Sequence, residues 1–309
     1  MVWHPKSDEI SISISELNFA KKHRGKKSTE TNNVIPERLT RRHCASKVGK
    51  VFDLTGRIAP IVANLKLDLH ELSIRQLDWD DKIPDELRPI WLDHFEMIQE
   101  ISSIKFERAI IHSDATSLDV NTINFEDASQ SLICASIYAR FPRPNKEFSS
   151  QLIFARTKIV PKDCTLPRAE LFAALVTTHT GEIVKRSLKK LHKSSIKLTD
   201  SQIALYWISN NEKQLKKWVR GRVPEIHRFS DKDVWYYIPT DQNRGDLGTR
   251  RGAVFKDNDQ SSSWINGHQW MKQPQSSFPI QSVADIKVSN QQMDKINKEQ
   301  NIIPTCHIN

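Results

Sequence analysis

The residues best able to do chemistry in this 309-residue sequence are four carboxylates between positions 127 and 246. Asp127 follows the alternating apolar run INFE, and Asp200 ends a second run, SIKLTD. Glu170 lies in the first turn of a long predicted helix, and Asp246 lies in the loop after the predicted strand VWYYIP. Strand ends and an adjacent helix start can converge at one edge of a sheet, so the four are candidates for a single site.

The chemistry of such a group follows from its charge. Carboxylates that crowd together repel one another and raise each other's pKa values. Divalent cations remove this penalty, and two Mg²⁺ ions about 4 Å apart can activate a water and stabilise the leaving oxygen of a phosphodiester. Hard oxygen ligands favour Mg²⁺ or Mn²⁺ over zinc. The set therefore predicts a site for two Mg²⁺ ions, with Mn²⁺ as a substitute.

Each carboxylate also has an ordinary structural interpretation. Asp200 precedes a predicted helix and can be its N-cap. Glu170 suits the positive end of a helix dipole. Asp246 can be a turn residue, and Asp127 can begin a hairpin. The occurrence of all four acids, in this order and on these elements, favours the metal site over these separate interpretations.

The elements that must position the carboxylates lie in residues 108–252. AIIHS, TINFED, SLICASIYARF and FSSQLIFARTKIV are typical of successive strands, because they are rich in β-branched and aromatic residues. PRAELFAALVTTHTGEIVKRSLKKL predicts a long helix, followed by the strand SIKLTD, the helix QIALYWIS, a helix broken near Pro224, and the strand VWYYIP. This order predicts a mixed α/β unit built on a single sheet.

Three further zones flank this unit. In residues 1–35, SDEISISISEL reads as a strand followed by a basic loop, and the lack of a nearby partner suggests the edge of something truncated. Residues 36–107 are expected to be mainly helical, with Gly56 ending one helical stretch and with Ile90, Trp91, Phe95 and Ile98 on one face of another. Residues 253–309 are polar and expected to be partly disordered, with SSSWINGHQWM as an apolar island.

Composition narrows the classes of protein. The net charge is +9 and the pI is about 9.3, which fits a polyanionic partner if the charge is clustered. The four cysteines form no CxxC pair, which argues against a zinc site. No apolar run approaches the ~20 residues of a membrane span, and the N-terminus lacks the apolar region of a signal peptide. We expect a soluble intracellular protein, cytoplasmic or nuclear and not secreted, with no membrane partner.

Two clusters of cations are candidates for contact with a polyanion. The first lies on the helix predicted at 211–229 and comprises Lys213, Lys216, Lys217, Arg220 and Arg222. Trp218 on the same helix is expected in the core, so Lys213, Lys216, Lys217 and Arg220 are expected to face solvent. There the cluster could bind phosphates with a steep dependence on salt. The second comprises Lys185, Arg186, Lys189, Lys190 and Lys193 near the end of the long helix, where the helix dipole also favours cations. The alternative for both is an ordinary solvated face.

Several segments resemble a known family in its own order. FEDASQSLICASIYAR, TKIVPKDCTLPRAELFAAL, LTDSQIALYWI, KKWVRGRVPEI, VWYYIPTDQNRGDLGTRRG and SSWINGHQWM are similar to the region after the reverse transcriptase in BEL/Pao-type LTR retrotransposon polyproteins. LTRRHCASKVGKVFDLTGRIAPIVANLKLDLHEL resembles the helical connection segment of that family, and VWHPKSDEISI resembles the last strand of its polymerase. The resemblance covers roughly residues 1–275.

The resemblance implies a ribonuclease H-like mixed five-stranded sheet with flanking helices in residues 108–252, behind a helical connection segment in residues 36–107. It implies that Asp127, Glu170, Asp200 and Asp246 are catalytic metal ligands for hydrolysis of the RNA strand of RNA–DNA hybrids. Partners would be the hybrid or another nucleic acid, and the reverse transcriptase part of the same polyprotein. A virus-like particle in the cytoplasm is then one expected location.

The sequence also departs from the family pattern. Glu126 stands where the family has Cys or a small residue, although strand alternation should turn it away from Asp127. RGDLGTRRG replaces NPADLASRG, so the turn before Asp246 lacks its proline. A catalytically inactive nucleic-acid-binding or scaffold remnant is therefore an alternative. An aspartic peptidase is less favoured, because the nearest motif, Asp53-Leu54-Thr55-Gly56, is one residue too long.

Overall fold

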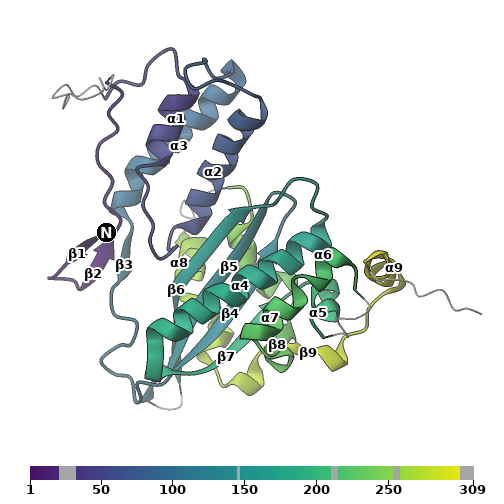
Figure 1. Cartoon of the computed structure of the whole chain (residues 1–309). Helices are drawn as coiled ribbons and strands as arrows, with labels where there is room; N and C mark the ends of the chain where they lie inside the picture. The colour runs from purple at the N-terminus through teal and green to yellow at the C-terminus, as the bar shows by residue number, and fades with distance from the viewer. Residues whose placement is uncertain (21–32, 145–146, 210–214, 253–257, 300–309) are drawn as a thin grey trace, which may run out of the picture. The chain divides into compact units, whose positions relative to one another are not determined.

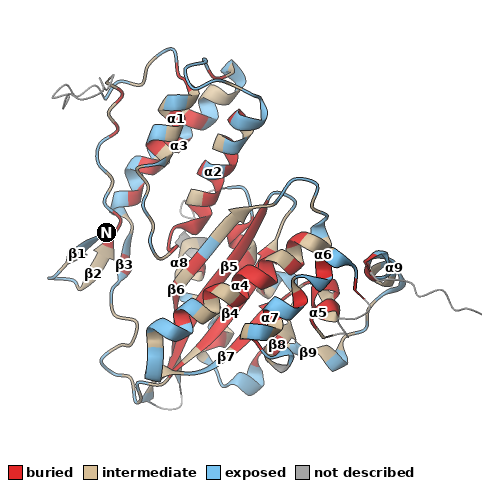
Figure 2. Cartoon of the chain, in the orientation of Figure 1, coloured by how far each residue is buried: buried red, intermediate tan, exposed pale blue. Residues whose placement is uncertain are grey.

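The computed structural model describes residues 1–20, 33–144, 147–209, 215–252 and 258–299 (Figure 1). It contains two compact units. The first comprises residues 1–54 and 64–110, and the second comprises residues 55–63 and 111–309. Buried residues line the interior of each unit, as Figure 2 shows.

The first unit contains a small antiparallel sheet in the order β1-β2-β3. Its strands are β1 (Val2–His4), β2 (Glu9–Ser11) and β3 (Lys105–Glu107). The strand predicted in SDEISISISEL is thus shorter than expected, and it has partners on both sides. The hairpin forms because the chain turns at Asp8, whose φ is 52° and whose carboxylate pairs with Arg108 at 2.6 Å.

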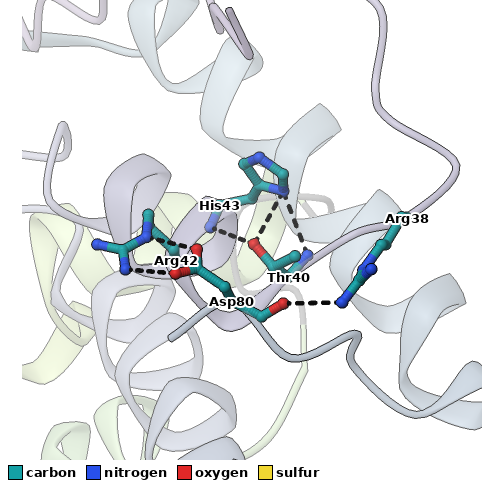
Figure 3. A network of polar contacts seen from close by, with 5 residues as sticks. All are labelled: Arg38, Thr40, Arg42, His43 and Asp80. Atoms are coloured by element: carbon teal, nitrogen blue, oxygen red, sulfur yellow. Dashed lines mark hydrogen bonds and ion pairs between the residues drawn. The ribbon is translucent and has the colours of Figure 1, made fainter. Parts of the chain in front are cut away.

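Three helices make up the rest of this unit: α1 (Arg41–Val48), α2 (Ala59–Ile74), whose first residues belong to the second unit, and α3 (Arg88–Glu100). Thr40 caps α1 through a capping box with His43 (Figure 3). Arg42 pairs with Asp80 at 2.7 Å, and the Asp80 carbonyl accepts a hydrogen bond from Arg38 at 3.3 Å. These contacts fasten the start of α1 to the loop that precedes α3.

The apolar faces of these helices form the core of the first unit. Trp91, Phe95 and Ile98 are buried as their helical spacing predicts, whereas Ile90 is 38% exposed because it lies off that face. His94 and Asp68 form a buried pair at 2.7 Å between α3 and α2.

Gly56 does not end a helix, contrary to the sequence-based expectation. The helix α1 already ends at Val48, with Gly49 at its C-cap. Gly56 has φ of +74° and lies against the backbone of Ala155, where an added Cβ would come within 1.9 Å of the carbonyl oxygen. A close approach to a strand of the second unit, to which Gly56 itself belongs, explains this glycine.

The second unit is built on a six-stranded mixed sheet in the order β6-β5-β4-β7-β8-β9. Its strands are β4 (Val120–Ala128), β5 (Leu132–Pro142), β6 (Phe148–Ile159), β7 (His192–Thr199), β8 (Trp235–Tyr237) and β9 (Gln281–Ser282). β4 runs antiparallel to β5 and parallel to β7, and β8 runs parallel to β7. The mixed sheet is confirmed. The prediction of a strand at AIIHS is wrong, and the two-residue β9 adds a sixth strand to the five expected.

Helices lie on one face of this sheet: α4 (Leu166–Leu188), α5 (Gln202–Ser209), α6 (Lys217–Arg220) and α7 (Val223–Phe229). α4 packs against β4 and β5 (Figure 1). The helix breaks near Pro224 as expected: α6 ends at Arg220, and α7 begins at Val223 with Pro224 in its first turn.

The other face is covered by the C-terminal segment, which includes α8 (Asn258–Asn266) and is followed later by α9 (Asn290–Lys298). Trp264, Met271 and Phe278 share a core with residues of β4 and β5, among them Phe125 and Tyr138. The Tyr138 hydroxyl donates to the Trp264 carbonyl at 2.7 Å. The apolar island of the sequence is therefore a structural cover of the sheet. No helix within the described ranges is long and apolar enough to span a bilayer.

Candidate active site

Two carboxylates lie at the same edge of the sheet because their strands are adjacent and parallel. β4 and β7 pair with Phe125 opposite Leu198, so Asp127 and Asp200 each lie two residues beyond a paired position. The Nδ2 of Asn243 reaches both, at 3.4 Å from the Asp127 Oδ1 and 3.2 Å from the Asp200 Oδ1. The same nitrogen donates to the Glu126 carbonyl at 2.9 Å. Asn243 therefore joins the ends of the two strands.

The loop that carries the fourth acid is held tightly against β4. Asn243 caps the short 3₁₀ helix Arg244–Gly248 by accepting a hydrogen bond from the Gly245 N–H at 3.0 Å. A Cβ on Gly245 would lie 2.8 Å from the Cβ of Asp127, so only glycine permits this approach. The Thr249 hydroxyl donates to the Asp127 Oδ2. Asp246, on this helix, is therefore carried to the edge where β4 ends.

Glu170 comes to this edge from α4. The helix begins at Leu166, after Thr165 and with Pro167 in its first turn, so Glu170 lies just beyond the first turn and not within it as predicted. Its Oε2 accepts a hydrogen bond from the Ser201 hydroxyl at 2.5 Å. The Ser201 Oγ in turn accepts from the Ala204 N–H at 3.1 Å and so caps α5. Asp200 is not needed as the cap, and its carboxylate is available to the site.

The four acids are near enough to affect one another's pKa values. Burial, together with the charges of Asp200 and Asp246, raises the pKa of Asp127 to about 8. Burial raises the pKa of Glu170 to about 7, with Asp200 adding to the effect. Burial also raises the pKa of Asp200, and Asp246 contributes. These mutual effects agree with the backbone and hydrogen-bond geometry, which places the four predicted acids at one edge of the sheet.

The donor set fits a hard divalent cation, since it consists of crowded, partly buried carboxylate oxygens. Two cations of the chain interact with these carboxylates. Arg250 forms an ion pair with Asp246, and Lys295 lowers the pKa of Glu170 against the larger effect of burial. Across the described residues, no three His, Cys, Asp or Glu side chains converge closely enough to hold a metal ion as they stand. The acids are gathered at one edge, but they are not closed into a coordination shell.

Glu126 is the least expected carboxyl near the site. It is 1% exposed, and neither carboxylate oxygen has a hydrogen-bond partner of normal geometry. Burial raises its pKa well above the usual value, an effect that the Thr199 side chain only partly offsets and that Asp200 and Glu170 increase. Asn124 and Glu126 are two residues apart on β4, so their side chains point to the same face of the sheet. Asn124 lies against Gly181 of α4, so Glu126 also points to the α4 face.

The predicted nucleic-acid-binding residues differ in their surroundings, and Lys213 lies outside the described residues. Lys216, Lys217 and Arg220 are exposed, although the Lys216 ammonium donates to the Lys298 carbonyl. Arg222 is turned inward: its guanidinium lies 3.6 Å from the centre of the Trp218 ring and donates to the Trp218 carbonyl at 2.9 Å. Three of the cations are thus presented to solvent, and Arg222 is engaged with an aromatic ring.

Asn243, Ser201 and Thr249 contact the carboxylates but were not singled out from the sequence. Each lies within three residues of a predicted acid. Asn243 also stands in the QNRGDLG string that carries the family resemblance, where the asparagine is shared with NPADL. This shared asparagine was the signal in the sequence that could have identified Asn243 as a site residue.

The sheet order and its flanking helices define a ribonuclease H-like fold. The chain belongs to the family described as the Pao retrotransposon-like RNaseH-like domain, whose model matches residues 40–201, more than half of the 309 residues. The matched region includes Asp127, Glu170 and Asp200.

Comparison with solved structures gives a match to the crystal structure of RNase H1 from the halophilic archaeon Halobacterium salinarum NRC-1. The two chains are 11% identical, the match covers 41% of this chain and 90% of that chain, and the TM-score is 0.27. No curated protein matches this chain.

Proposed function

We propose that this chain is a metal-dependent ribonuclease that hydrolyses the RNA strand of RNA–DNA hybrids. The observation that carries the proposal is the gathering of Asp127, Glu170, Asp200 and Asp246 at the edge where β4 and β7 end. Membership of a retrotransposon family with a ribonuclease H-like domain supports a nucleic-acid substrate. The same membership suggests the reverse transcriptase part of the polyprotein as a further partner.

In this proposal the four acids would hold two Mg²⁺ ions, for which Mn²⁺ can substitute. The ions would supply activation of water and stabilisation of the leaving oxygen. The chain itself orients the ligands: Asn243 fixes Asp127 relative to Asp200, and the Ser201 hydroxyl fixes Glu170. Recognition of the hybrid would depend on backbone shape and 2′-hydroxyl groups, with little preference for sequence.

Cleavage of a labelled RNA–DNA hybrid tests the proposal. We expect cleavage in Mg²⁺ and a loss of at least about 100-fold in Asp200→Asn, because removing one carboxylate of the set weakens metal binding. Asp163→Asn is the matched control, since Asp163 is exposed in the loop before α4 and its φ of 59° suits asparagine. Equal activity of Asp200→Asn and the parent chain would refute the proposal.

A catalytically inactive nucleic-acid-binding remnant is the second candidate. Two observations favour it: the buried and unpartnered Glu126 beside the site, and the pairing of Asp246 with Arg250. Binding of hybrids without cleavage at any Mg²⁺ or Mn²⁺ concentration would select it. A peptidase is not proposed, because the Thr55 carbonyl is bonded to the Ala155 N–H at 2.9 Å and Gly56 lies against the same residue.

A further inference from the structure

A second group of charges lies at the opposite end of α4 from Glu170. The basic end of α4, as we call it, comprises five exposed cations: Lys185, Arg186, Lys189, Lys190 and Lys193. Arg186 pairs with Glu182 at 2.8 Å, and Lys193 pairs with Asp119 at 3.4 Å. The ammonium groups of the other three lysines have no ion pair or hydrogen bond to any residue that the structure describes.

Lys197 lies beside this group in an unusual position for a cation. It is on β7, 5% exposed, and without an ion-pair or hydrogen-bond partner within the described ranges. Burial and the charge of Lys185 lower its pKa to about 8, whereas Glu182 and Asp231 act in the opposite direction. A polar side chain buried to this degree normally has a partner, so the group has unused capacity for an anion.

A helix dipole explains only part of this arrangement. Cations in the last turn of a helix are stabilised by the helix dipole, which accounts for Lys185 and Arg186. It does not account for Lys197, which is on a strand. It also does not account for the repulsion that Lys185 exerts on His192 and Lys197, in each case secondary to the effect of burial.

We propose that the basic end of α4, together with Lys197, binds the phosphate backbone of nucleic acid at a distance from the carboxylates. The inference rests on the proposed nucleic-acid function and adds a second contact surface to it. Backbone phosphates fit because they present a row of single negative charges to separate ammonium groups and require no particular base. An anion would also relieve the repulsion within the group.

The spacing along α4 sets the length of duplex that could use both surfaces. Lys189 follows Glu170 by 19 residues, which corresponds to about 28 Å at about 1.5 Å per residue of helix. One turn of a DNA duplex spans about 34 Å. A duplex of about two turns can therefore reach from the carboxylates to the basic end of α4, whereas one shorter than about 28 Å, or about 0.8 turn, cannot.

The experiment measures binding by the full chain carrying Asp200→Asn, so that cleavage does not interfere. The probes are fluorescent RNA–DNA hybrids of about 8 base pairs, about 0.8 turn, and about 24 base pairs, a little over two turns. Both are titrated over a range of salt concentrations. Lys185→Gln/Lys189→Gln is compared with the matched control Arg156→Gln/Lys287→Gln, which removes two exposed cations elsewhere on the second unit.

For the long hybrid we expect the slope of log K against log salt to fall in magnitude by about 0.9 for each lost contact in Lys185→Gln/Lys189→Gln, and to stay the same in the control. Lys197→Met should weaken binding of the long hybrid several-fold while raising the melting temperature, because it removes a buried cation. A rise in melting temperature separates this effect from misfolding.

The outcomes distinguish this inference from the proposed function. Equal slopes in the test and control variants would overturn the inference and leave hybrid cleavage untouched. A slope difference in a chain that never cleaves hybrids would remove the nuclease proposal and leave the second surface in place. Equal affinity for the short and long hybrids in the parent chain would also overturn the inference.

Discussion

Asn243 shows how one amide can organise several charges. Its Nδ2 lies within hydrogen-bond distance of Asp127, Asp200 and the Glu126 carbonyl, and its Oδ1 accepts from Gly245. Without it, two carboxylates and a buried carbonyl would lose a donor in a poorly solvated place. The position of the loop that carries Asp246 depends on the same side chain.

Asn243→Ala should therefore lower the free energy of unfolding by about 1–3 kcal/mol, the cost of leaving buried acceptors unsatisfied. Urea denaturation in EDTA measures this effect without metal. Asn266→Ala is the control, because the amide of Asn266 makes an exposed contact to Ser262 at 3.3 Å. A loss no larger than in that control would contradict the role assigned to Asn243.

Glu126 offers a prediction about pH. Because its pKa is raised in the folded protein, the folded state keeps a proton that the unfolded chain releases above its ordinary pKa near 4.5. The stability associated with this group is thus present at low pH and is lost as the pH rises above that value. Glu126→Met should be more stable than the parent, with a gain that grows from pH 5 to pH 8 in EDTA. A gain independent of pH would refute the argument.

At the scale of elements, the parallel pairing of β4 with β7 creates the site. It places two strand ends at one edge, and α4 and the 3₁₀ helix Arg244–Gly248 bring the remaining acids to it. The arrangement concentrates negative charge, so it should respond to divalent cations in a pH-dependent way.

Mg²⁺ should raise the melting temperature more at pH 8.5 than at pH 5.5. Asp127 and Glu170, with pKa values of about 8 and 7, carry protons at the lower pH, and these must leave before a cation can bind. Differential scanning calorimetry with and without Mg²⁺ measures the shift. Asp163→Asn should behave like the parent and Asp200→Asn should show little shift, whereas a larger shift at pH 5.5 would count against the site.

Much of this element arrangement is predictable from the sequence. The alternating runs of the sequence predict the long strands correctly. The predicted position of Glu170 is wrong only by a small shift relative to the first turn of α4, because Pro167 marks where that helix starts. The prediction of a strand at AIIHS is wrong because a short apolar run does not reveal whether a pairing partner exists. Asn243 was missed because its importance depends on contacts to Glu126 and Asp200, which are 117 and 43 residues away. Pattern and propensity carry no information at such separations.

At the scale of the whole molecule, the two units have separate cores, and the second is completed by the C-terminal segment. Polar composition suggested disorder for residues 253–309, but a few large apolar side chains decide the structure of the described part. Trp264 is fully buried, and its indole N–H donates to the Arg57 carbonyl at 2.8 Å.

Trp264→Ala should destabilise the second unit by about 3–5 kcal/mol, through lost burial and the cavity that remains. Trp79→Ala is the matched control, since Trp79 is 50% exposed in the first unit and should change stability far less. Urea denaturation followed by circular dichroism compares the two. A loss of stability in Trp264→Ala as small as that in Trp79→Ala would show that the segment is not part of the core.

The cover of the sheet also has a consequence for biosynthesis. Tyr138 and Trp264 are 126 residues apart, and a ribosome adds about 5–20 residues per second, so roughly 6–25 s separate their synthesis. During that interval the nascent polypeptide exposes the apolar face of β4 and β5 that Trp264 later covers. Chaperone capture of ribosome-bound intermediates should accordingly be strongest after β6 has emerged and should end once the tryptophan arrives.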